Sequence, residues 1–171
     1  MGLPSVLKNM NMFLNGVTCV GEIPEVTVPP LARKMENYRG GGLDGTLAID
    51  LGMADDPITF EWKPGGLMER VYDGFGGATI DSEMIRWVGA HQDDGTGQMK
   101  AVEITVRGRH SSIEDGTQKP GELGERTVTT LCSFYQMTID GREKIYIDVP
   151  NMICRVNGVD RLAQSRAILG I

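Results

Sequence analysis

The sequence predicts a mainly β fold class: a β-barrel or sandwich with one flanking helix and a short C-terminal helix. Twenty-three glycines are scattered in turn-like contexts among short apolar stretches, as in domains built from many strands and tight turns. Several of these stretches alternate apolar and polar residues, which is the period of a half-buried strand. The length of 171 residues suits one domain with its own core. We therefore expect residues 1–171 to form a single domain.

The first strands are expected to be short. Met12–Asn15 and Val17–Val20 flank Gly16 as the two arms of a hairpin. The alternating segment Ile23–Val28 predicts a third strand, which ends at Pro29-Pro30 because proline cannot donate to a ladder.

A long polar segment follows over residues 31–45, with the sequence LARKMENYRGGGLDG. Its centre, Gly40–Gly42, is too flexible for a core element. Loops of this length are uncommon unless they carry a function. The sequence therefore predicts a functional loop here, before two further strands at Thr46–Leu51 and Ile58–Trp62.

A helix and a series of longer strands are expected next. Apolar residues recur at helical spacing over Leu67–Phe75, and Gly76-Gly77 ends this helix. Ser111–Glu125 is polar and rich in turn residues, which predicts a second exposed loop. The expected strands are Met84–His91, Met99–Gly108, Thr127–Ile139 and Lys144–Val149, the last two joined by a turn at Asp140-Gly141.

Two segments leave alternatives open. Neither face of Thr127–Ile139 is charged, so one face contacts the core and the other a second chain or sheet, or both are buried in one sandwich. The last helix, Asp160–Leu169 with Asp160 as its N-cap, is too short to be stable alone and must dock. It docks either on its own barrel or on a neighbour, with Arg161 and Arg166 as its contacts.

The charge balance narrows the function classes. Seventeen Lys and Arg stand against 23 Asp and Glu, a net charge of −6. Tight binding of DNA or RNA needs a basic surface that displaces counterions, and this chain lacks that excess. No apolar run is long enough for a transmembrane helix, and the first residues do not form a secretory leader.

No reaction centre is visible. Three widely spaced cysteines (Cys19, Cys132 and Cys154) make a poor disulfide framework and a poor metal site. The histidines, His91 and His110, lie apart beside turns and are expected at the surface or an edge. No nucleophile, phosphate-binding or dinucleotide motif occurs. We expect no enzyme activity, no cofactor and no metal.

Several blocks of sequence resemble one family. They are MNMFLNG, LARKMENYRGGGLDG, IDLGM, VRGR (Val106–Arg109), YQMTIDGRE (Tyr135–Glu143) and NGVDRLAQSRAILGI. In order and spacing they are similar, nearly end to end, to the major tail tube protein of contractile-tailed bacteriophages, the FII-type family, and to the tube protein of R-type pyocins. The block Asn157–Asp160 with the terminal helix is the most specific.

The resemblance implies a fold like that of the type VI secretion tube protein, and a structural role without catalytic residues. It implies hexameric rings that stack into a hollow tube inside a contractile sheath, cross the host envelope and conduct DNA. The implied partners are the protein itself, the sheath, a tape-measure protein, and baseplate and tail terminator proteins. The implied location is the virion tail, assembled in the host cytoplasm. The alternatives are an effector-delivery tube of the type VI kind and a monomeric β-sandwich binding module.

The resemblance also indicates which residues meet a neighbouring ring. These are Arg33, Lys34, Glu36, Tyr38, Arg39, Gly40, Gly41 and Gly42. A bore that conducts DNA should not hold it, so outward-facing strand residues of acidic or neutral type are expected to line the lumen. The candidates are Glu103 and Thr105, with Thr129 and Ser133, although Arg107 on the same face counts against a uniformly negative wall.

Overall fold

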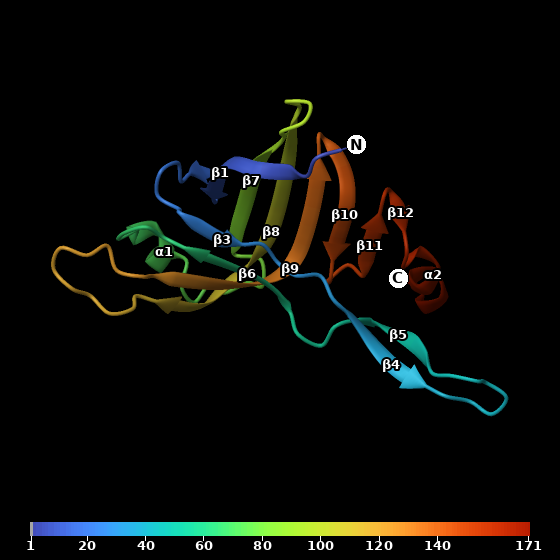
Figure 1. The fold of residues 1–171 in the computed structure, drawn as a ribbon. Helices are drawn as coiled ribbons and strands as arrows, with labels where there is room; N and C mark the ends of the chain where they lie inside the picture. The colour runs from blue at the N-terminus through green and yellow to red at the C-terminus, as the bar shows by residue number, and fades with distance from the viewer. Residues whose placement is uncertain (1) are drawn as a thin grey trace.

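The computed structural model describes residues 2–171 and confirms the mainly β fold class with two short helices (Figure 1). The strands are β1 (Ser5–Leu14), β2 (Val17–Thr18), β3 (Glu25–Thr27), β4 (Arg33–Tyr38), β5 (Leu47–Met53), β6 (Ile58–Lys63), β7 (Glu83–Asp93), β8 (Met99–Glu114), β9 (Thr127–Ile139), β10 (Arg142–Asp148), β11 (Ile153–Val156) and β12 (Val159–Asp160). The helices are α1 (Glu69–Asp73) and α2 (Ala163–Leu169).

Ten strands form one antiparallel sheet that bends over itself. Its order is β12-β11-β10-β9-β8-β7-β1-β2, and β6 and β3 branch from β9. β8 accompanies β9 along its length, whereas the other edge of β9 pairs first with β6 and then with β10. β9 therefore turns from the direction of β6 to that of β10 (Figure 1), and the core lies inside this corner.

A β-bulge in β9 allows this turn. Between the pairs Gly108–Cys132 and Arg107–Phe134, Ser133 is an extra residue. Before the bulge the even-numbered residues of β9 face the core, and after it the odd-numbered ones do. The two uncharged faces of this strand thus arise because the inward face changes partway along it.

The core is built by side chains that the two parts of the sheet direct toward each other. Phe60 and Trp62 of β6 are fully buried in the same cluster as Ile85 and Trp87 of β7. Burial of four such side chains is worth roughly 6–12 kcal/mol in transfer free energy, before entropy costs.

The first helix is shorter than predicted, and only part of its apolar stripe is buried. Met68 and Val71 pack into the core, but Leu67, Tyr72 and Phe75 are exposed. Helical spacing alone does not distinguish residues that face the core from apolar residues left at the surface.

The long loop predicted at residues 31–45 was the main error. Arg33–Tyr38 is a strand, β4, which pairs with β5 in a separate two-stranded sheet. The hairpin projects from the body (Figure 1), and a turn remains around Gly40–Leu43. The segment lacks the alternation of a half-buried strand because its own chain buries neither face. Similarly, β8 continues to Glu114, so the second loop starts later than predicted.

We predict that Gly108→Ala destabilises the fold severely, by about 3 kcal/mol or more. A Cβ at Gly108 would lie 2.0 Å from the Leu131 carbonyl oxygen, a backbone atom of the neighbouring strand that cannot move aside. Urea unfolding compared with wild type measures the loss. Gly66→Ala is the matched control, because a Cβ there meets nothing within 4 Å. Equal stability of the two variants would contradict the prediction.

Candidate functional site

The β4–β5 hairpin offers an apolar surface that its own chain leaves uncovered. Residues opposite one another in an antiparallel pair share a face, and the pairs here are Glu36–Ile49 and Tyr38–Leu47. Leu51 continues the same face, two residues beyond Ile49. We call this set the apolar hairpin face: Glu36, Tyr38, Leu47, Ile49 and Leu51. Its three aliphatic side chains are 44–55% exposed.

The opposite face and the base of the hairpin are held by ion pairs. Arg33 donates two hydrogen bonds of 3.0 Å to the Asp50 carboxylate, which also accepts the Gly52 amide at 2.8 Å. The Arg33 hydrogen bond lowers the pKa of Asp50. Exposed pairs of this kind add little stability, and an isolated two-stranded hairpin is marginal in water. The hairpin is therefore suited to being completed by a partner.

The residues expected to meet a neighbouring ring differ in whether their charges are paired within the chain and in whether they lie on β4 or after it. Arg33 and Lys34 are already bound within the chain, the latter to Asp55 at 2.7 Å. Glu36 and Arg39 form no salt bridge within residues 2–171. The residues on the strand are Arg33, Lys34, Glu36 and Tyr38, and those after it are Arg39, Gly40, Gly41 and Gly42.

A second surface is the outward face of β7, β8 and β9. Glu103 and Thr105 lie on it, as expected for residues that point away from the core. Glu103 is not a free carboxylate, because Arg86 donates to it at 2.7 and 3.1 Å. This contact lowers the pKa of Glu103 despite its partial burial, and the Arg86 guanidinium also lies 5.0 Å from the Phe13 ring centroid.

The same pairing of charges continues onto β10 and β11. Glu143 accepts hydrogen bonds from Arg155 and Gln136 at 3.1 Å each. The Arg155 guanidinium lies 3.8 Å from the centre of the Tyr146 ring. Sequence reasoning missed Arg86, Gln136, Glu143 and Arg155. The available signal was opposite charges at outward positions of neighbouring strands.

The other two lumen candidates lie further along the sheet. Thr129 pairs with Ser112 and Glu61, before the bulge. Ser133 is the bulge residue itself, and its hydroxyl donates to the Ile80 carbonyl at 3.4 Å. The structure therefore does not bring these two residues together with Glu103 and Thr105.

The C-terminal helix is anchored on its own chain. Arg166 donates to the Met152 carbonyl at 2.8 Å and to the Asp160 carboxylate at 2.5 Å. Asp160 is not the N-cap, since it lies in β12 and Leu162 occupies the N-cap position, without a side-chain capping hydrogen bond. Its carboxylate still accepts the Leu162 amide at 3.0 Å, and Arg166 lowers its pKa.

The end of α2 after Arg166 leaves apolar side chains exposed to solvent. Ile168 and Leu169 are 77% and 62% exposed. Arg161 is exposed and forms no salt bridge within residues 2–171.

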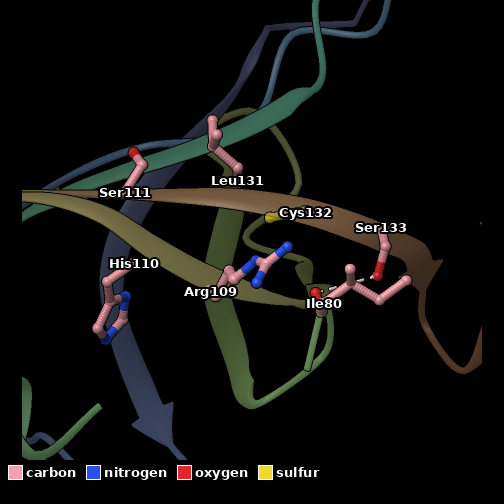
Figure 2. Close-up of a pocket in the computed structure, with 7 residues that line it drawn as sticks. All are labelled: Ile80, Arg109, His110, Ser111, Leu131, Cys132 and Ser133. Carbon is pink, nitrogen blue, oxygen red and sulfur yellow. Dashed lines mark hydrogen bonds between the residues drawn. The ribbon is translucent and has the colours of Figure 1, made fainter. Parts of the chain in front are cut away.

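A pocket of about 390 Å³ opens at the bulge of β9, between Ile80, Arg109, Leu131 and Ser133 (Figure 2). In Figure 2 the Arg109 guanidinium lies beside Cys132 and Ile80, while His110 points to the other side of its strand.

His110 and Cys132 both line this pocket but do not form a catalytic pair. Burial raises the pKa of the Cys132 thiol to about 12, so no thiolate forms at neutral pH. His110 bonds to the Thr130 hydroxyl at 2.9 Å instead. It is only 4% exposed, so its expected place at the surface was wrong; it is an inward residue of β8.

Two further kinds of feature, a metal site and a membrane-spanning helix, are not found in the described residues. Within residues 2–171 no three His, Cys, Asp or Glu side chains gather as a metal site would require. No helix in the same range is both long and apolar enough to cross a bilayer.

The surfaces described above are exposed faces that other copies or other proteins could cover. Residues 4–170 match the family model for phage tail tube protein FII. The chain belongs to this family, and it is a structural tail tube subunit, a component of a phage tail, and not an enzyme.

Two phage proteins show the relationship over most of their length. The chain is 43% identical to the tail tube protein of Escherichia phage P2 over 172 residues, which cover all of both chains. It is 32% identical to the major tail tube protein of Serratia phage KSP20, over 92% of this chain and 91% of that one. These relatives support the structural tail tube role over the alternative of a β-sandwich binding module.

A solved structure shares the fold. It is the sheath/tube terminator of an extracellular contractile injection system, PVC, in its extended state. The TM-score is 0.60 over 79% of this chain and 96% of that one, at 9% identity. At this identity the likeness concerns the fold alone.

We predict that His110 makes the protein less stable in mild acid. Burial lowers its pKa from the ordinary 6.5, and the nearby Glu83, 3.9 Å away, only partly opposes this. The unfolded chain therefore takes up the proton first, so stability is complete above pH 6.5 and declines as the pH falls toward the folded pKa. Urea midpoints between pH 7.5 and 5 should fall less steeply for His110→Asn than for wild type. Parallel slopes would contradict the assignment.

Proposed function

We propose that copies of this protein close into hexameric rings, and that the rings stack into the hollow tube of a contractile tail. The β4–β5 hairpin joins one ring to the next. The observation that carries this proposal is the exposed apolar hairpin face, which has no supporting layer in its own chain. Family membership gives the context, because the relatives are tail tube proteins.

The hairpin contact suits a cooperative assembly. Covering three half-exposed aliphatic side chains contributes about 3 kcal/mol per hairpin, or roughly 20 kcal/mol over six hairpins, before association costs. A single hairpin therefore binds weakly and leaves free subunits dispersed. A whole ring binds firmly.

The stack is open-ended because the two contacting surfaces differ. A contact between unlike patches propagates until something stops it. We therefore assign the length of the tube to a tape-measure protein, and its ends to baseplate and terminator proteins. A sheath protein surrounds the tube. Assembly takes place in the host cytoplasm, and the completed tube crosses the host envelope.

The outward face with Glu103 and Thr105 is proposed to line the bore through which DNA passes. Its support is the pairing of charges: Arg86 with Glu103, and Arg155 with Glu143. A wall without an excess of cations releases few counterions and so does not retain DNA. Thr129 and Ser133 lie further along the sheet and are left out of this lining. Arg107 on the same face is exposed, with its guanidinium 4.8 Å from the Phe134 ring centroid, and it counts against a uniformly negative wall.

We predict that Leu47→Asp abolishes ring stacking and leaves the subunit folded. The new carboxylate would be buried without a partner when the hairpin docks, but it is exposed in the free subunit. Negative-stain images and sedimentation should show rings without long tubes. Leu123→Asp is the control, an equally apolar residue, 81% exposed, on the loop between β8 and β9. Wild-type tubes from Leu47→Asp would contradict the proposal.

We predict that Glu103→Gln slows the passage of DNA through the tube. The substitution leaves the Arg86 guanidinium without its carboxylate, which places one uncompensated cation per subunit on the proposed bore. Ejection of DNA from particles carrying the variant should slow and recover with added salt. Glu22→Gln, which removes a carboxylate from Arg70 in the loop between β2 and β3 and so away from the outward face of β7–β9, is the control. An unchanged ejection rate would remove Glu103 from the bore.

A further inference from the structure

Stacking through the hairpin requires a second patch that receives it, and this inference rests on the proposed function. The hairpin brings one charge with its apolar surface. Glu36 lies opposite Ile49 on the apolar hairpin face and forms no salt bridge within residues 2–171. Burying Ile49 removes water from the Glu36 carboxylate, which is costly unless a cation meets it. The receiving patch must therefore combine apolar walls with a free cation.

The pocket at the bulge of β9 meets both conditions. Ile80 and Leu131 supply apolar walls and are 47% and 36% exposed. Arg109 lines the same pocket, with its guanidinium beside Ile80 in Figure 2, and within residues 2–171 it has no carboxylate in salt-bridge range. Docking would also remove water from Arg109. The attraction between Arg109 and Glu36 then offsets the free-energy cost of burying the two charges.

The other large pockets fit less well. A pocket of about 400 Å³ is lined by Leu31, Met53 and Ile147, but it lies at the base of the hairpin itself. Arg161 also lines this pocket, but Arg33 and Asp50 of the hairpin base form part of its wall, so it adjoins the hairpin of its own copy. A third pocket, of about 650 Å³, is lined by Glu114, Glu122 and Glu125, which would repel Glu36.

We propose that the apolar hairpin face of one copy covers the Ile80–Leu131 pocket of a copy in the next ring, with Glu36 bound to Arg109. The aliphatic residues of the hairpin meet Ile80 and Leu131, and the carboxylate meets the guanidinium in a site closed to water. The hairpin and the pocket are different patches, so the contact propagates in one direction.

A charge exchange tests this contact in purified protein. The variants are Glu36→Arg, Arg109→Glu and the double variant that carries both. Each single variant places like charges together, so the concentration at which tubes appear should rise about tenfold or more. The double variant restores the opposite charges and should return that concentration close to the wild-type value. Tube length by negative-stain imaging and mass by sedimentation are the readouts.

Two controls keep the outcome unambiguous. Arg107 precedes Arg109 by two residues on the same strand face, so Glu36→Arg with Arg107→Glu should not restore tubes. Glu36 and Arg109 are both exposed in the free subunit, so we expect the variants to fold, and thermal melts of the purified variants test this. Arg109→Gln serves as a milder variant.

The possible results separate this inference from the function on which it rests. If Arg109→Glu builds normal tubes while Leu47→Asp does not stack, the hairpin binds a different surface of the next ring. Only this inference is then overturned. If both single charge variants fail and the double variant also fails, the pairing is overturned. If Leu47→Asp stacks normally, both the inference and the hairpin function are overturned.

Discussion

The structure depends on the ladder between β8 and β9 and on the close backbone approach within it. At Gly108 the two strands come so near that a Cβ would meet the Leu131 carbonyl oxygen, and one residue later in the ladder Ser133 bulges out of β9. This local change lets β9 leave β6 and continue beside β10. The core, the outward charged face and the pocket beside Arg109 are all set by where the strand turns. A side chain at position 108 would therefore affect every surface at once.

The subunit divides its apolar residues between two uses. The sheet corner buries large aromatic and aliphatic side chains and needs no partner to do so. The hairpin and the end of α2 leave aliphatic side chains in water, among them Leu47, Ile49 and Ile168. A monomeric protein rarely keeps contiguous surfaces of this kind, whereas a protein that assembles requires them. The net charge of −6 helps free copies to stay dispersed.

The sequence predicted best the elements that the chain stabilises by itself. β9 has the expected bounds, and Asp140-Gly141 adopts the positive φ angles of 49° and 75° that its hairpin turn requires. β4 was missed because both of its faces are exposed, so no periodicity marks it. The charge pairs on the outward face depend on register, since Arg86 on β7 reaches Glu103 on the neighbouring strand β8. Patterns within one strand do not contain that information.

Three of the exposed surfaces are each held in shape by an arginine bound to a carboxylate of the same chain. Arg33 binds Asp50 at the hairpin base, Arg86 binds Glu103 on the outward face, and Arg166 binds Asp160 beside the last helix. In all three pairs the hydrogen bond lowers the carboxylate pKa, so the contribution is present at neutral pH and is lost as the pH falls through the folded pKa. Exposed pairs add little to the stability of the fold. Their role is to fix local geometry: the bulged base of the hairpin, the charge balance of the outward face and the docking of α2. The surfaces are thereby ordered before any neighbour binds, which lowers the entropy lost when copies assemble.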